Sequence, residues 1–248
     1  MSREIPDLNE KILRCAQNDR KGLINIMPFT MTHLHTAKNI YRMCPENISD
    51  LSQFYLGTIA PDAVHNRENY ISDYKKASHL LVGDEPWGMI TNNDGWIENA
   101  VGFFDTHKND ENFDFIFGYC SHILTDAYNS INVWMPFKQK YHDEASKGYG
   151  GLYHLESNKI DIEIALNDRN KEDFWVYLEK SKSIDFNNIV FADEIDKQKE
   201  NILNHWYKNK ERQDLSSNKV VTIESTMKFI DEATVFVLSK LLPAIKMT

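Results

Sequence analysis

A histidine and an aspartate four residues apart form the local pattern in this chain that is best suited to chemistry. His122 and Asp126 would lie on the same face of a helix, where an imidazole and a carboxylate can reach one metal ion. Gly118 lies one turn earlier on that face, and its missing side chain would leave room for an ion or a substrate. A His–Asp hydrogen bond in a helical core has the same spacing, and the motif taken alone favours that simpler interpretation.

A second set of polar residues strengthens the prediction of a metal site. Asp62 follows a hydrophobic segment that ends in a proline, and an aspartate held there is a hard oxygen ligand or a base. His79 lies among apolar residues, which is typical of a core histidine and also of a buried ligand. His33 and His35 are two positions apart on a predicted helix, so at most one of them can face the same site.

Amphipathic helices must position these side chains. Apolar residues recur at helical spacing in four long segments, 31–44, 111–131, 191–212 and 223–242. Shorter helices are predicted at 48–57, 95–107, 153–166 and 170–180, whereas prolines and glycines make 57–94 irregular. With only 10 glycines and 7 prolines, the chain also lacks the turns of a β-sandwich or barrel. We expect an all-α protein built as a single multi-helix bundle.

Charge and composition exclude several classes of protein. The 28 basic and 37 acidic side chains give a net charge of −9, which argues against a non-specific nucleic-acid binder or a protein that coats anionic membranes. Cys15, Cys44 and Cys120 form no close pair, so neither a disulfide framework nor a thiolate zinc site is predicted. No apolar run reaches the roughly 18 residues of a membrane span. We expect a cytoplasmic protein.

The order of these patterns resembles the zinc-dependent phospholipase C family, whose fold is shared by single-strand-specific zinc nucleases. The resemblance covers residues 27–165 and rests on four pieces: Thr32-His33-Leu34, Gly57-x-x-Ala60-x-Asp62, Ser78-His79 and Gly118-x-x-x-His122-x-x-x-Asp126. Members of that family are all-α bundles that hold two or three zinc ions and hydrolyse phosphodiesters. The resemblance implies the same fold and activity here, for a domain of residues 27–248 with residues 1–26 as an extension.

The resemblance also implies a set of metal ligands. His33, Asp62, His79, His122 and Asp126 take the family's ligand positions, with Asp126 bridging two ions and Asp62 placed to act as a base. Two zinc ions are the expected cofactors, although imidazole and carboxylate ligands also accept manganese or iron. Two further candidate ligands, for a later metal site, are His154 and Glu156.

The chain departs from the family pattern at that later site and at its start. A family histidine six residues after the bridging aspartate is replaced by Asn132, and the later His-x-x-x-Glu pattern runs from His154 to Asn158. Family members that are exported complete one site with a mature N-terminal tryptophan, whereas this chain begins with Met1. We therefore expect two ions, or one tight and one weak, rather than three.

The expected activity is metal-dependent hydrolysis of a phosphate ester by a metal-activated water. The expected substrate is a small-molecule or lipid-headgroup phosphodiester, and the acidic net charge disfavours nucleic acid. A non-catalytic helical scaffold or sensor that binds metal is the alternative, and Asn132 favours it. The adjacent His142 and Asp143 resemble the pair in HD-type phosphohydrolases, which is a minor alternative because the rest of that pattern is missing.

Overall fold

The computed structural model describes residues 29–169 and 171–246, and within these residues the chain is helical. They contain eleven α-helices and no strand, so the predicted all-α class is confirmed. None of the helices in the described ranges is long and apolar enough to cross a membrane. The predicted extension, residues 1–26, lies outside the described residues.

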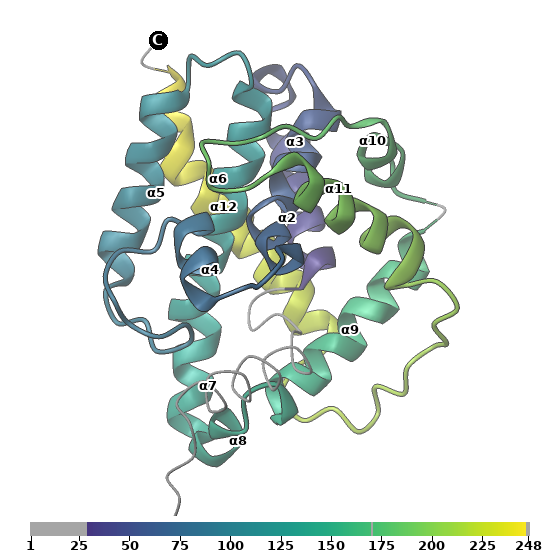
Figure 1. The fold of residues 1–248 in the computed structure, drawn as a ribbon. Helices are drawn as coiled ribbons and strands as arrows, with labels where there is room; N and C mark the ends of the chain where they lie inside the picture. Colours follow the sequence, from purple (N-terminus) through teal and green to yellow (C-terminus); the bar gives the residue numbers. More distant parts are fainter. Residues whose placement is uncertain (1–28, 170, 247–248) are drawn as a thin grey trace, which may run out of the picture.

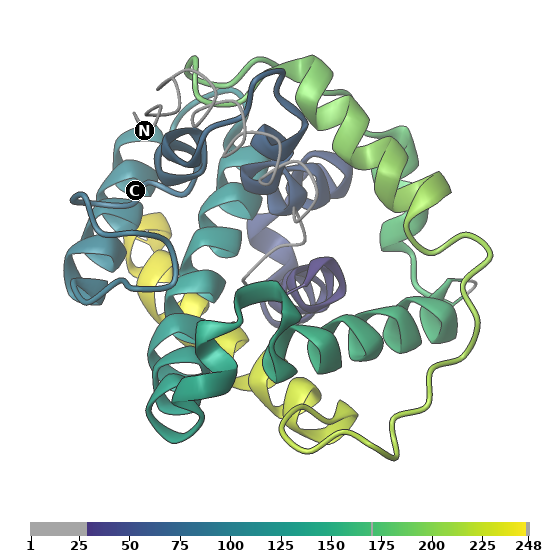
Figure 2. The same cartoon turned by 60° about the horizontal axis from the view of Figure 1, so that its bottom comes forward.

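Helix α2 (Thr30–Met43) occupies the middle of the molecule. It contacts α3 (Leu51–Ile59), α6 (Phe113–Asn129), α9 (Leu152–Asp168) and α12 (Ile223–Lys246), which surround it in Figures 1 and 2. Because neighbours cover it on several sides, α2 buries polar residues as well as apolar ones over most of its length. Such a helix can direct two buried histidines to different places in the core.

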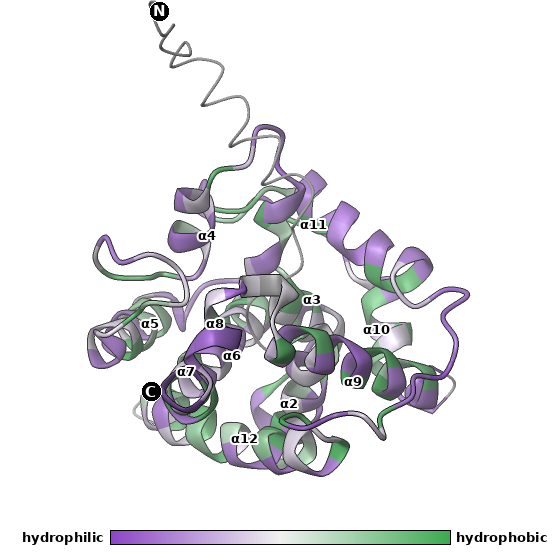
Figure 3. Cartoon of the chain, turned by 90° about the horizontal axis from the view of Figure 1, so that it is seen from below, coloured by the Kyte–Doolittle hydropathy of each residue, from purple (hydrophilic) through white to green (hydrophobic). Residues whose placement is uncertain are grey.

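Shorter helices complete the bundle. Helix α5 (Asn93–His107) packs on α6, α10 (Phe174–Lys180) packs on α3, and α11 (Ala192–Glu200) packs on a 3-10 turn, Pro61–Asn66, that follows α3. The remaining helices are α4 (Ser72–Ser78), α7 (Met135–Lys140) and α8 (His142–Ser146). Figure 3 shows hydrophobic residues gathered where helices face one another and hydrophilic residues along the loops and outer faces.

Two glycines bring α3 and α6 into unusually close contact. A Cβ atom at Gly118 would overlap the carbonyl oxygen of Phe54 and would lie 2.9 Å from the nitrogen of Thr58. A Cβ atom at Gly57 would meet the backbone of α6 in the same way. The space beside Gly118 is therefore filled by the backbone of α3, and the prediction that it leaves room for an ion or a substrate is wrong.

The helix boundaries differ from the predicted ones in two segments. The segment 57–94, predicted to be irregular, contains α4 and the turn Pro61–Asn66, since short polar helices carry no long apolar period. The helix predicted over 191–212 is shorter, because α11 passes into a π-helical turn, Asn201–His205, and the chain then leaves the helix. Asn209 in the following turn has a φ angle of 60°.

Candidate metal centre

Five of the predicted ligands lie together in the core, and three helices and a turn supply them. His33 comes from α2, and His122 and Asp126 come from successive turns of α6. Asp62 lies in the turn after α3, and His79 caps the C-terminal end of α4. Each of these side chains belongs to a residue that is at most 5 % exposed. The fold therefore brings together residues that lie up to ninety-three positions apart in the sequence (126 − 33).

Asp62, His79 and His122 form the first group of side chains that could hold a metal ion, and Asp126 lies beside it. Asp126 Oδ2 lies 3.4 Å from His79 Nε2 and 3.6 Å from His122 Nε2. Asp62 places Oδ1 3.4 Å from His79 Nε2 and Oδ2 4.0 Å from His122 Nε2. Ligand atoms bound tetrahedrally at about 2.0–2.1 Å from zinc are about 3.3–3.4 Å apart. The spacings within the group of Asp62, His79 and His122 thus fit a single ion with little rearrangement.

The other oxygen of Asp126 faces a second position. Asp126 Oδ1 lies 3.3 Å from His33 Nε2, and the ring of His33 stacks on that of His122 with centroids 3.7 Å apart. His33, His122 and Asp126 form a second group of side chains that could hold a metal ion. Because one imidazole nitrogen can bind only one ion, His122 cannot complete both groups at once. The second position is consequently poorer in ligands than the first.

Hydrogen bonds at the Nδ1 atoms of His79 and His122 leave the Nε2 atoms of both rings directed at the carboxylates of Asp62 and Asp126. His122 Nδ1 lies 2.8 Å from the carbonyl oxygen of Thr58, which accepts a hydrogen bond from it. His79 Nδ1 lies 3.0 Å from the carbonyl oxygen of Lys75 and 2.9 Å from Ser78 Oγ. Contacts of this kind fix the tautomer and ring orientation of metal-binding histidines. The close approach of α3 to α6 at Gly118 is what brings Thr58 within reach of His122.

Buried atoms without hydrogen bonds indicate that the cluster suits a cation. His122 Nε2 and both oxygens of Asp126 are buried, yet they make no hydrogen bond with any residue that the structure describes. Buried polar atoms of this kind are uncommon because leaving them unpaired is costly. A divalent ion between these nitrogen and oxygen atoms would satisfy all of them. The residues therefore fit a metal ion in both geometry and chemistry.

Lys75 is part of the cluster, although it is not among the predicted residues. Its Nζ atom lies 3.2 Å from Asp62 Oδ1, 3.3 Å from His65 Nε2 and 4.5 Å from the ring centroid of Trp87. The residue is buried, so its ammonium group is a fixed positive charge beside the candidate ligands. Its position four residues before His79, on the same helical face, is the one signal in the sequence that could have indicated it.

Burial and nearby charges set the protonation of the cluster. Burial lowers the pKa of His79 to about 3 and that of His122 to about 4, so both rings are neutral and able to bind metal. Burial raises the pKa of Asp126 to about 7. Burial also tends to raise the pKa of Asp62, but the positive charge of Lys75 helps to hold that pKa well below its ordinary value.

The structure separates the two histidines of α2. His33 faces the cluster, whereas His35 Nε2 lies 2.6 Å from Asp168 Oδ2 in a buried pair outside it. Of the two alternatives that the sequence leaves open, His33 is therefore the one that lies with the other candidate ligands.

The two later candidates, His154 and Glu156, lie outside both groups of metal-ligating side chains in the described structure. Glu156 accepts three backbone hydrogen bonds, at 2.7–2.8 Å, and so anchors the segment 219–221. The His154 ring packs against the aromatic rings of Trp134 and Tyr153. These contacts give both residues a packing or anchoring role in this structure.

The remaining motif, the adjacent His142 and Asp143, is far more exposed than the cluster. Both side chains are exposed, and neither belongs to a group of potential metal ligands among the described residues. The HD-type interpretation therefore gains no support from the fold. Asn132, the residue that departs from the family pattern, donates a hydrogen bond to the carbonyl oxygen of Tyr128 one turn earlier.

Comparisons with models of protein families, with curated proteins and with solved structures find no match for this chain. A function for the chain is therefore proposed from the geometry and chemistry of the buried cluster.

Proposed function

We propose that this chain is a metal-dependent hydrolase of phosphate esters with a helical bundle of the phospholipase C type. The observation that carries the proposal is the position of Asp126, one of whose oxygens faces His79 and His122 while the other faces His33. A carboxylate with this placement can bridge two ions about 3.5–4 Å apart, a separation suited to in-line displacement at phosphorus. The resemblance of the ligand order to zinc-dependent phospholipase C supports the same activity.

The residues of the cluster have distinct roles in this proposal. A bound divalent ion supplies Lewis acidity and lowers the pKa of a coordinated water towards about 7. His79 and His122 bind through neutral Nε2 atoms, and Asp62 is ionised beside Lys75, so it can accept a hydrogen bond from the attacking water and orient it. The ammonium group of Lys75 offsets part of the negative charge that a phosphate brings into a buried site.

Zinc is the proposed metal because the ligands are imidazole and carboxylate groups at tetrahedral spacing. Manganese or iron would also accept these donors. The position between Asp62, His79 and His122 would bind one ion tightly, and the position at His33 and Asp126 would bind a second ion more weakly. The proposed substrate is a small-molecule or lipid-headgroup phosphodiester, since a net charge of −9 does not favour a nucleic acid.

A non-catalytic metal-binding protein is the second candidate, and the closure of the cluster favours it. Asp126 lies 3.4 Å from His79 Nε2, so a small shift would add it to the group of Asp62, His79 and His122 as a fourth ligand. Four protein ligands fill a tetrahedral sphere, as in structural zinc sites, whereas catalytic sites keep one position for water. The buried state of all the candidate ligands agrees with such a site. In that case the ion would stabilise the bundle without hydrolysing a substrate.

Metal analysis combined with a hydrolysis assay separates the two candidates. The protein is purified without chelator, its zinc, manganese and iron are measured, and zinc or manganese is then added back. Hydrolysis of bis(p-nitrophenyl) phosphate is followed with and without chelator. Chelator-sensitive hydrolysis supports the proposal, whereas stoichiometric metal without hydrolysis supports the second candidate. Failure to take up any metal would refute both.

Two aspartates provide a matched pair of variants for this experiment. Asp126 and Asp168 are both buried, and each lies against a histidine of α2. Asp126→Asn is expected to lose bound metal and hydrolysis together. Asp168→Asn is expected to lower stability and keep both. Equal metal content in the two variants would show that Asp126 is not a ligand.

A further inference from the structure

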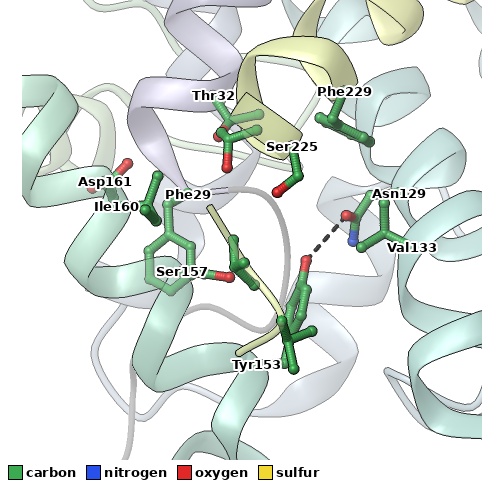
Figure 4. A pocket seen from close by; sticks show the side chains of 13 residues that line it. Phe29, Thr32, Asn129, Val133, Tyr153, Ser157, Ile160, Asp161, Ser225 and Phe229 are labelled. Carbon is green, nitrogen blue, oxygen red and sulfur yellow. Dashed lines mark hydrogen bonds between the residues drawn. The ribbon is translucent and has the colours of Figure 1, made fainter. Parts of the chain in front are cut away.

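A cavity lies beside the metal centre, on the side of His33 and Asp126. Its volume is about 140 Å³, it is partly open to solvent, and it is lined by residues of α2, α6, α9 and the chain at the start of α12 (Figure 4). Thr32 on its wall directly precedes His33, and Asn129 follows Asp126 by three residues, which is about one turn of α6. A molecule in the cavity would therefore lie one residue along α2 from His33 and about one turn along α6 from Asp126.

The walls of the cavity are mostly apolar and carry no basic side chain. Phe29, Val133 and Phe229 are among the apolar residues that line it, and no lysine or arginine of the described ranges does. One acidic residue, Asp161, reaches the wall, but its oxygens accept hydrogen bonds from the Met31 amide at 2.8 Å and from a tyrosine hydroxyl. A charged ligand would find no counter-ion in the cavity, and burying it would be costly.

One polar group on the wall has no partner in the described structure. Asn129 is 2 % exposed, and its Oδ1 atom accepts a hydrogen bond from the hydroxyl of Tyr153 at 3.1 Å (Figure 4). Its Nδ2 atom is buried and makes no hydrogen bond with any described residue. A buried amide of this kind needs an acceptor. An oxygen atom of a molecule in the cavity would supply one.

We propose that this cavity binds a compact neutral group, a six-membered ring or a branched alkyl chain, that carries one hydroxyl or ester oxygen. The oxygen accepts a hydrogen bond from Asn129 Nδ2, and the carbon skeleton contacts the apolar wall at Val133 and Phe229. An apolar cavity of about 150 Å³ in another protein holds benzene, so a ring of this size fits. The group is the alcohol portion of the substrate, an assignment that rests on the proposed function.

Binding of three small probes to the full chain tests the proposal. Benzyl alcohol, toluene and benzoate are titrated into the metal-free protein and the zinc-loaded protein, and binding is followed by amide chemical-shift changes. Benzyl alcohol is expected to bind to both forms, about three- to tenfold more tightly than toluene because of its hydrogen bond. Benzoate, which is charged and of similar size, is expected not to bind.

Variants of the wall locate the binding and separate shape from hydrogen bonding. Val133→Trp fills the cavity and is expected to abolish binding, whereas Val235→Trp, at an exposed position of α12, is the matched control. Asn129→Leu keeps the approximate volume but removes the donor, so benzyl alcohol and toluene should bind equally well to it.

The two proposals fail in different ways. If benzyl alcohol does not bind, if Val133→Trp leaves binding unchanged, or if Asn129→Leu retains the preference for the alcohol, the cavity proposal is overturned whatever the metal content. If the probes bind as expected but the protein takes up no metal, the cavity proposal stands as a binding site and the hydrolase proposal is refuted.

Discussion

Replacement of Gly118 by alanine should damage the metal centre although residue 118 touches no metal ligand directly. The added Cβ atom would lie 3.0 Å from the carbonyl carbon of Phe54 and 2.9 Å from the nitrogen of Thr58. Both neighbours are backbone atoms, so no side chain can rotate away. The two helices must separate, and the carbonyl oxygen of Thr58 moves away from His122.

The size of the effect follows from these distances. The Cβ atom would overlap the carbonyl oxygen of Phe54, and carbon atoms in contact are normally about 3.5–4.0 Å apart, so α3 must move by more than about 1 Å. The hydrogen bond between His122 Nδ1 and Thr58, now 2.8 Å long, would lengthen to the limit of a hydrogen bond or beyond it. Overpacking of this kind costs about 1–3 kcal/mol of unfolding free energy. Loss of an outer contact to a metal-binding histidine weakens metal affinity about 10–100-fold.

Gly102→Ala is the matched control, because Gly102 also lies inside a helix, α5, and a Cβ atom there would meet nothing within 4 Å. This variant should gain about 0.5–1 kcal/mol, since alanine is the better helix former. Urea unfolding of the metal-free proteins and zinc titration against a chelator dye measure the two effects. If Gly118→Ala matches Gly102→Ala in both stability and zinc affinity, the argument from helix contact is refuted.

Three further predictions concern charge in and around the cluster. Lys75→Met should lower the unfolding free energy of the metal-free protein by about 3–5 kcal/mol, because it leaves Asp62 buried without its cation. Added zinc should then raise the Tm of this variant more than that of the wild type, and an equal rise would contradict the proposed charge balance. At pH 6, zinc uptake should release about one proton, because the carboxyl of Asp126, with a pKa of about 7, must ionise while the two imidazoles are already neutral. Affinity should therefore increase with pH up to about 7; calorimetry in two buffers of different ionisation enthalpy measures the proton count, and release of two protons would show that an imidazole is protonated in the metal-free form. Glu156→Gln should cost about 1–3 kcal/mol by weakening its hold on residues 219–221 while leaving metal content unchanged, and loss of metal would restore Glu156 as a ligand.

The parts of the site that could be predicted are those that depend on local spacing. His122 and Asp126 lie on one face of α6 because the helical period places residues four apart together. The long amphipathic helices were predictable for the same reason. The order of His33, Asp62 and His79 along the chain supported the resemblance to the zinc-dependent phospholipase C family. The fold brings these three residues to the same place.

The features that could not be predicted depend on contacts between distant segments. Gly118 lets the backbone of α3 approach α6, and helical periodicity in the sequence does not indicate which segment packs against a given helix position. Glu156 looks like a ligand in the sequence, yet its carboxylate binds a backbone segment from a different part of the chain. Lys75 stands beside Lys76 in a polar helix, where a pair of lysines is typical of an exposed face. Lys75 is buried because α4 packs against the turn that follows α3, a contact that the sequence does not indicate.

The ammonium group of Lys75 beside Asp62 has a consequence for the order in which folding and metal loading occur. In a zinc finger the ion must be present for the chain to fold, and chelators unfold the domain. In this chain Lys75 balances one carboxylate, and the raised pKa of Asp126 lets the other keep a proton near neutral pH. Without metal, the cluster would thus carry little uncompensated charge, which would allow the bundle to assemble first. Metal would then bind to ligands that are already in place and displace a proton, so metal supply would limit activity and not the yield of folded protein.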